Sequence, residues 1–230
     1  MQEFFSNTLF WGLAITFITY GIGIVLKAKL KLPIFNPLLV AIILTIVFLL
    51  IFKIDYKSYN EGAKYISYLL TPATIALAVP LYKKLEILKA NKLAIMMGIG
   101  SGVISSILII LLLSLGLRLT HAEYVSFLPK SITTAIGMDI SKELGGIVPI
   151  TVIVIVLTGV FGNIVSDGVF KLFRIKDPIA RGIALGTSAH AIGTAKAFEL
   201  GELEGAMSSL SIAIAGILTV ILAPLFAGII

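Results

Sequence analysis

The segment that decides the fold is Leu93–Leu117, which reads LAIMMGIGSGVISSILIILLLSLGL and contains no charged residue. A helix needs about 20 mainly apolar residues to cross about 30 Å of hydrocarbon, and this segment reaches that length. Strands of a membrane barrel would show about ten residues of alternating polarity instead, so helices are the remaining way to pair the backbone in lipid. Similar apolar runs cover Thr8–Leu26, Leu38–Phe52, Ala63–Tyr82, Ile147–Phe170 and Met207–Ile230.

The composition excludes several other classes of protein. The chain of 230 residues is 58% hydrophobic and 13% charged, and the basic residues behind its net charge of +6 are scattered between the apolar runs. Such scattering is typical of membrane loops, and no basic stripe indicates binding to nucleic acid. With no cysteine and two histidines, neither a metal centre nor another cofactor is expected. The run Thr8–Leu26 is too long for the apolar part of a cleavable signal peptide.

The charges of the loops predict the topology. The basic clusters Lys27–Lys31, Lys83–Lys92 and Lys171–Arg181 are assigned to the cytoplasm, which places the N-terminus outside. The parity of the spans then requires Phe127–Gly146 to begin and end on the outer side and Arg181–Gly201 on the cytoplasmic side. Each stretch would be re-entrant or broken, although a full crossing by either would shift the later assignments. The expected fold class is all-α integral membrane, with about six to eight transmembrane helices and these two broken stretches.

An internal repeat favours an inverted pair. Ala135-Ile136-Gly137 and Glu143-Leu144-Gly145 recur, at the same offset of 56 residues, as Ala191-Ile192-Gly193 and Glu199-Leu200-Gly201. A second alignment, at an offset of 116 residues, matches Thr71 with Thr187. Because the residue types are common, chance is an alternative explanation for either alignment. We expect one polytopic membrane domain over 1–230, with scaffold helices in 1–60 and a transport bundle in 61–230 that is broken near 70–80, 130–146 and 181–201.

The broken stretches carry glycines and hydroxyls at membrane depth. Irregular backbone is tolerated there only where it packs in protein or lines a watery cavity. The free N–H groups and positive dipole end of a broken helix attract an anion, and hydroxyls can complete its coordination. The alternative is close helix packing through small residues. The residues predicted to bind substrate are Ser131, Thr133, Thr134, Gly137, Gly186, Thr187, Ser188, His190, Gly193 and Thr194, and Pro72 and Pro80 are predicted to be structural breaks.

Ionisable residues in or beside these stretches are candidates for coupling to ions or protons. His190 is the one histidine inside an apolar stretch, and it either contacts substrate and moves protons or is a neutral imidazole held between helices. Asp139 and Lys196 are the other coupling candidates, unless they lie at a membrane interface. Lys130 and Arg181 either draw an anionic substrate in or anchor the interface. Catalysis is not expected, since no metalloprotease motif or phosphate-binding loop occurs.

An ordered series of motifs resembles the LrgB/CidB family over nearly the whole chain. The motifs are Asn36-Pro37-Leu38-Leu39, Pro72-Ala73 through Pro80-Leu81-Tyr82, Leu128-Pro129-Lys130-Ser131-Ile132-Thr133-Thr134, Gly186-Thr187 through His190, Gly193-Thr194-Ala195 and Glu204-Gly205-Ala206-Met207-Ser208-Ser209-Leu210. The chain departs from the family at Thr134-Ala135-Ile136-Gly137, where relatives tend to have Thr-Pro-Ile-Ala. It also departs at Thr187-Ser188-Ala189-His190, where relatives tend to have Thr-Ala-Ser-His, so the hydroxyl of Ser188 is rotated by about 100° on a helix.

The resemblance implies a multi-pass protein of the bacterial or archaeal plasma membrane. Relatives are called antiholin-like or holin-like and are associated with murein hydrolase regulation and lysis, some serve in pyruvate uptake, and a related plant plastid protein exchanges glycolate and glycerate. We predict a carrier for small monocarboxylates such as pyruvate, lactate, glycolate or glycerate, which works by alternating access. The alternative is a holin-like or antiholin-like pore or regulator of murein hydrolase activity and lysis. The expected partners are a small organic anion, the lipid bilayer, a second copy in a homodimer and a small LrgA-like or CidA-like membrane protein.

Overall fold

The computed structural model describes residues 10–30, 32 and 34–230. In this part of the chain all regular elements are helices, and five of them are long and apolar enough to cross a membrane. The five are Trp11–Leu30, Tyr56–Lys83, Lys92–Leu117, Val148–Leu172 and Glu202–Ala227. The predicted all-α membrane fold is confirmed. The predicted number of spans stays a prediction, because the start of the run Thr8–Leu26 and Lys31 of the first basic cluster lie outside the described residues.

The chain divides into two compact units, Met1–Ala76 and Leu77–Ile230. The described part of the first unit contains α2 (Trp11–Leu30), α3 (Pro37–Ile51), α4 (Tyr56–Ala63) and the 3₁₀ helix η1 (Lys64–Leu69). The Asn36 side chain begins α3 by accepting hydrogen bonds from the backbone N–H groups of Leu38 and Leu39. Hydroxyls join these helices, because Thr19 and Thr45 share a hydrogen bond of 3.1 Å. The roles of scaffold and transport bundle that the sequence predicts for 1–60 and 61–230 stay predictions.

Helix α5 (Leu70–Lys83) crosses the boundary between the two units and is followed by α6 (Leu85–Ala90). Both predicted break residues, Pro72 and Pro80, lie within α5, and the helix continues past each of them. The irregular geometry of this region lies before them, in the 3₁₀ helix Lys64–Leu69. Neither proline is therefore where a helix ends.

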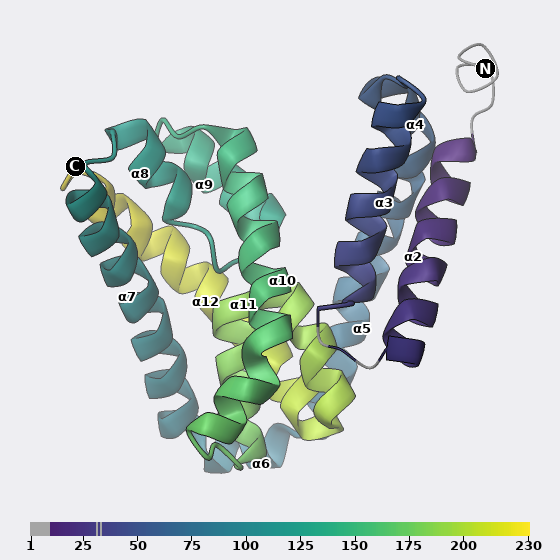
Figure 1. The fold of residues 1–230 in the computed structure, drawn as a ribbon. Coiled ribbons are helices and arrows are strands. Elements are labelled where there is room, and N and C mark those ends of the chain that lie inside the picture. Colours follow the sequence, from purple (N-terminus) through teal and green to yellow (C-terminus); the bar gives the residue numbers. More distant parts are fainter. Residues whose placement is uncertain (1–9, 31, 33) are drawn as a thin grey trace. The chain divides into compact units, whose positions relative to one another are not determined.

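The second unit is built around three long helices and two hairpins (Figure 1). The long helices are α7 (Lys92–Leu117), α10 (Val148–Leu172) and α12 (Glu202–Ala227), and the hairpins follow α7 and α10 in the chain. The largest apolar cluster of the described residues joins α7, α8 and α12 through side chains such as Ile99, Tyr124 and Met207, which are fully buried. These helices therefore enclose one core within the unit.

The first hairpin consists of α8 (His121–Phe127), a loop and α9 (Thr134–Glu143). A capping box of Thr120 and Glu123 begins α8. The two ends of the hairpin lie together, because the His121 Nε2 atom is 3.1 Å from the carbonyl oxygen of Leu144 and the N–H of Ile147 donates to Ser126 Oγ at 2.6 Å. The loop between α8 and α9 extends toward the middle of the unit (Figure 1).

The second hairpin lies inside α11 (Pro178–Leu200), whose backbone leaves helical geometry at His190 (φ 42°, ψ −133°). A β-carbon on Gly193 would strike the carbonyl oxygen of Leu185, whereas residues eight apart in a straight helix are separated by about 12 Å. The chain therefore reverses at His190 into two arms. Both arms pack on the start of α12, since Gly182 faces the carbonyl of Glu204 and Thr194 shares a 2.7 Å hydrogen bond with Ser208.

The two hairpins overlap the stretches that the parity of charges singles out, although all but the last residue of α8, the first arm of the first hairpin, precedes the predicted stretch Phe127–Gly146. The segments matched at the offset of 56 residues, 135–145 and 191–201, contain the returning arm of each hairpin. Entry of the hairpins into a bilayer from opposite faces, and the inverted repeat itself, stay predictions.

Candidate functional site

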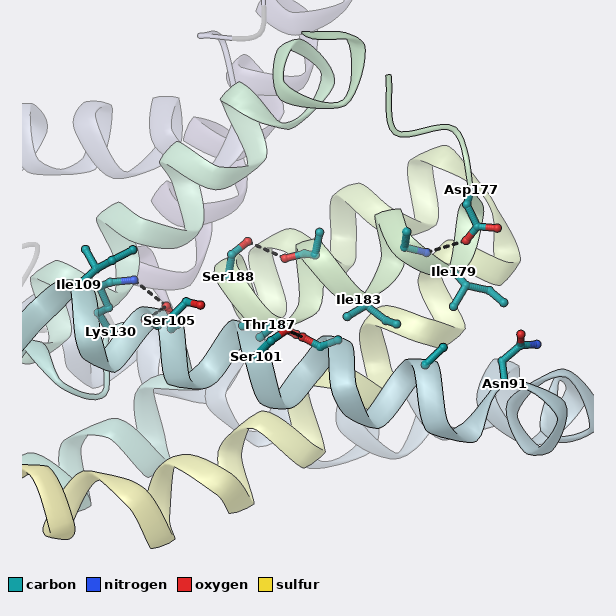
Figure 2. Close-up of a pocket in the computed structure, with 17 residues that line it drawn as sticks. Asn91, Ser101, Ser105, Ile109, Lys130, Asp177, Ile179, Ile183, Thr187 and Ser188 are labelled. Carbon is teal, nitrogen blue, oxygen red and sulfur yellow. Dashed lines mark hydrogen bonds between the residues drawn. The ribbon is translucent and has the colours of Figure 1, made fainter. Parts of the chain in front are cut away.

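A cavity of about 770 Å³ lies between α7, the first arm of α11 and the loop of the first hairpin. This volume is within the range of about 300–1,000 Å³ typical of small-molecule sites. Its polar lining residues are Asn91, Ser101, Ser105, Ser106, Lys130, Ser131, Asp177, Thr187 and Ser188. Figure 2 shows that the cavity is elongated, with Lys130 and Ser105 at one end and Asn91 and Asp177 at the other.

The inner end of the cavity is formed where the loop of the first hairpin touches α7. The ammonium group of Lys130 donates to Ser131 Oγ at 2.8 Å, and the hydroxyls of Ser131 and Ser106 are 3.3 Å apart. Ser106 lies fourteen residues after Lys92, which is about 21 Å along a helix that rises 1.5 Å per residue. The helix α7 has 26 residues, so this contact lies near its middle.

Thr187 is the most informative residue of the cavity. Its side chain is 5% exposed, and within the described part of the chain its hydroxyl has no hydrogen-bond partner. It also lines a second, adjacent cavity of about 10 Å³, together with Ser106 and Ser131. That space is about the size of one water molecule. A buried hydroxyl without a protein partner is costly, so Thr187 is poised to bond a ligand or water in these cavities.

The other end of the cavity, at Asn91 and Asp177, has different chemistry. Asp177 lies there and caps the start of α11, because its Oδ1 atom accepts a 2.8 Å hydrogen bond from the N–H of Ala180. Ser188 is exposed and lines the cavity, but its hydroxyl donates to the carbonyl oxygen of Ala184 at 2.6 Å. The sequence predicts Ser188 as a binding residue, but its O–H already donates to a backbone carbonyl, so this hydroxyl could only accept a hydrogen bond from a ligand.

His190 occupies the tip of the second hairpin rather than the lining of the cavity. Its side chain is 4% exposed, and its Nε2 atom lies 2.9 Å from the carbonyl oxygen of Ile155. Thr194, one turn later, donates to the carbonyl oxygen of His190 at 3.0 Å. These contacts hold the reversal of the chain against α10 and α12.

The remaining predicted binding residues also lie outside the cavity lining. Thr133 precedes α9 as its cap residue and Thr134 begins that helix, and both are half-buried. The three predicted glycines allow close packing: Gly137 faces Ile155, Gly186 faces the carbonyl of Ser208, and Gly193 faces Leu185. Of the ten predicted binding residues, the structure brings Ser131, Thr187 and Ser188 together in the cavity.

Like His190, the other coupling candidates, Asp139 and Lys196, do not line this cavity. Asp139 is exposed on α9. Lys196 pairs with Asp167 at 2.7 Å and with Glu199 at 3.8 Å. Arg181 donates from Nε to the carbonyl oxygen of Ile175 at 2.8 Å, which gives it a structural contact at the start of α11.

Helix α7 contributes lining residues that were not predicted from the sequence. Ser101, Gly102, Ser105 and Ser106 line the cavity, and a β-carbon on Gly102 would lie 2.7 Å from Cγ2 of Thr187. A signal was present, since serines at 101 and 105 are one helical turn apart and therefore share a face of an otherwise apolar segment. From its length and apolar composition, the segment Leu93–Leu117 was predicted only as a membrane span.

The long apolar helices define a multi-pass helical membrane protein. Its sequence matches the LrgB-like family over residues 16–229, so the chain belongs to the LrgB family. It is 40% identical over 222 residues to the antiholin-like protein LrgB of Bacillus cereus (strain B4264), covering 96% of both chains. The same identity and coverage relate it to the antiholin-like protein LrgB of Bacillus anthracis (strain A0248). No solved structure matches the chain. Family membership and the apolar helices identify a multi-pass protein of the plasma membrane.

Proposed function

We propose that this protein is a membrane carrier for small monocarboxylates and works by alternating access. The observation that carries the proposal is the meeting of the two hairpins, through Ser131 and Thr187, in one cavity beside the middle of α7. Paired helical interruptions near the bilayer midplane are the recurring site architecture of secondary transporters. The hydroxyls and the ammonium group of Lys130 offer donors suited to a carboxylate. The family resemblance supports acids of the size of pyruvate and glycolate.

In this proposal the two hairpins enter the membrane from opposite faces. Each hairpin begins and ends at one level of the second unit, as His121 with Leu144 and Gly182 with Glu204 indicate. Movement of the hairpins relative to the long helices would expose the cavity to one side and then the other. His190 would take part by positioning the tip of α11, and Asp139 and Lys196 remain the proposed groups for ion or proton coupling.

A second candidate function is that of a holin-like or antiholin-like pore or regulator of murein hydrolase activity. It is favoured by the name shared by the relatives, antiholin-like protein LrgB, which fits this function better than a carrier. In that case the polar cavity would shape contacts between subunits or with a small LrgA-like partner. For either function we propose a homodimer, and native mass spectrometry of the purified protein with and without an LrgA-like protein tests both contacts.

The two functions differ in how permeability depends on substrate. Proteoliposomes would be loaded with carboxyfluorescein and assayed for uptake of labelled pyruvate, lactate, glycolate and glycerate, with and without ion gradients and an LrgA-like partner. A carrier gives saturable, selective uptake while the dye is retained. A pore gives unsaturable permeation of all four acids together with dye loss.

A matched pair of variants tests whether uptake depends on the cavity. Thr187→Val keeps the shape of the side chain and removes the hydroxyl, and we expect uptake to fall by about tenfold, the loss of one hydrogen bond to a charged group. Thr158→Val, on α10 and half-buried outside the cavity, is the control and should transport like the wild type. Wild-type uptake in both Thr187→Val and His190→Ala would remove the hairpin tips from the site.

A further inference from the structure

We propose that the ammonium group of Lys130 recognises the carboxylate of the substrate, with the hydroxyls of Ser131, Ser106 and Thr187 as its neighbours, in a site for one singly charged anion. This inference rests on the proposed function and goes beyond it by naming the charged group and the valence of the ligand.

The position of Lys130 makes its charge expensive without a counter-ion. Its partner Ser131 touches Ser106 near the middle of α7, so the ammonium group lies far from either end of that span. Ionisable groups at such depth in a membrane are costly and are normally paired or used in function.

No carboxylate of the described chain compensates this charge. Ion pairs join Lys84 to Glu202 and Lys196 to Asp167 and Glu199, and within the described ranges none involves Lys130. Among the residues that line the cavity the single acid is Asp177, which lies at the opposite end (Figure 2) and caps α11. The inner end therefore carries one positive charge that the chain leaves unbalanced.

The hydrogen-bond donors around Lys130 suit a carboxylate. An ammonium group has three donors, and one of them goes to Ser131 Oγ. Thr187 lines the same cavity, and its buried hydroxyl has no partner in the described chain. A carboxylate accepts about four hydrogen bonds, so it can take up the two remaining donors of Lys130.

The number of charges in the cavity sets the valence of the ligand. No second lysine and no arginine is among the lining residues, and the far end is acidic. A dicarboxylate would place its second charge either among apolar side chains such as Ile109 and Ile183 or toward Asp177. We therefore expect selection for monocarboxylates over dicarboxylates and over neutral analogues of the same shape.

The test measures binding separately from transport. Isothermal titration in detergent, in chloride-free buffer, would compare pyruvate with pyruvamide, its neutral analogue, and with succinate. Lys130→Gln should weaken pyruvate binding by at least about tenfold, the loss expected for a charge-assisted contact. Lys130→Arg should keep part of the affinity. The control is Lys142→Gln, an exposed lysine in the last turn of α9 in the same hairpin, which should bind pyruvate like the wild type.

Several outcomes would overturn the inference: equal pyruvate affinity in the wild type and Lys130→Gln, equal binding of pyruvate and pyruvamide by the wild type, or no binding of pyruvate by the wild type. If Lys130→Gln fails to fold, the ratio of pyruvate to pyruvamide affinity in the wild type and in Lys130→Arg decides. The proposed function fails separately, when Lys130-dependent binding is present without saturable uptake. Saturable uptake that is unchanged in Lys130→Gln would be consistent with a carrier but would contradict the proposed role of Lys130.

Discussion

The hydroxyl of Ser131 lies 3.3 Å from the hydroxyl of Ser106, so the loop of the first hairpin touches the middle of α7. On the other side of the same cavity, Thr187 belongs to the first arm of the second hairpin and packs against Gly102 of α7. One face of α7 thus receives both hairpins within about one helical turn, since positions 102 and 106 are four residues apart. This relationship makes α7 part of the candidate site, rather than only a span.

The face of α7 that lines the cavity should be reachable from water. Because the chain has no cysteine, single cysteines can be introduced without further changes. We expect Ser101→Cys and Ser105→Cys to react with a membrane-impermeant thiol reagent at least about tenfold faster than Leu112→Cys, because only a hydrated thiol forms the reactive thiolate readily. Leu112 is exposed but does not line the cavity, and so faces lipid in the proposed orientation. Equal rates at all three positions would contradict a cavity along α7.

The sidedness of that labelling reports the state of the cavity. Its Asn91–Asp177 end adjoins the basic cluster Lys83–Lys92, which the loop charges assign to the cytoplasm. Reagent added to the cytoplasmic face of inverted vesicles should therefore label Ser105→Cys, and reagent added to right-side-out vesicles should not. The reverse result would show that the cavity opens to the outside.

Gly186 should be intolerant of a side chain. A β-carbon there would strike the carbonyl oxygen of Ser208 and lie 2.8 Å from the β-carbon of Ser211, and the backbone of α12 cannot rotate away. We expect Gly186→Ala to destabilise the protein by about 1–3 kcal/mol, the cost of overpacking a core, and to lower uptake with it. Thermal unfolding in detergent measures the first effect. The control is Gly100→Ala on α7, where the β-carbon would meet open space, and its unfolding midpoint should stay the same or rise.

His121 should hold together the end of the second unit where α8 begins and α12 ends. Its two ring nitrogens lie 3.1 Å from the carbonyl oxygens of Leu144 and Ile230. His121→Ala removes both contacts, and we expect amide hydrogen exchange to become faster in residues 144–147 and at the end of α12. A neutral imidazole donates from one ring nitrogen only, so the loss corresponds to one hydrogen bond, about 0.5–1.5 kcal/mol of local stability. Unchanged exchange in both segments, relative to the exposed-site control Lys142→Ala, would show that the ring contributes nothing there.

Glu123 should make the stability of α8 depend on pH. The backbone N–H of Thr120 and then its hydroxyl donate to the carboxylate, each at 2.8 Å, and hold the pKa of Glu123 below its ordinary value. Since the pKa is lower in the folded state, the stabilisation is present above the ordinary glutamate pKa and is lost as the pH falls through the folded value. We expect Glu123→Gln to destabilise the protein near neutral pH and to have little effect at strongly acidic pH. Unfolding midpoints across that range measure the difference, with Glu143→Gln as the control; a constant difference would refute the contribution of the carboxylate.

The apolar runs and loop charges anticipated much of the described fold. The segments Leu93–Leu117 and Ile147–Phe170 correspond closely to α7 and α10, because a helix in lipid must be long and apolar whatever its neighbours are. The parity of basic clusters singled out 127–146 and 181–201; the second stretch covers most of the α11 hairpin, whereas the first covers the loop and α9 but only the last residue of α8. Pro72 lies in the first turn of α5 and Pro80 lies inside it, and their role as structural breaks stays a prediction.

The sequence alone determined that this protein is an all-helical membrane protein of the LrgB type with hydroxyl-rich interruptions, since length, hydropathy and motif order are properties of the chain itself. Tertiary structure decided which of those hydroxyls share a cavity. It places Ser131 and Thr187 beside α7, bonds His190 to a carbonyl of α10, separates Lys130 from Arg181, and adds Ser106 to the site. The physical reason is that the serines of α7 mark one of its faces, but they do not specify which segments pack against that face. Only the packing of the hairpins against it fixes which side chains meet.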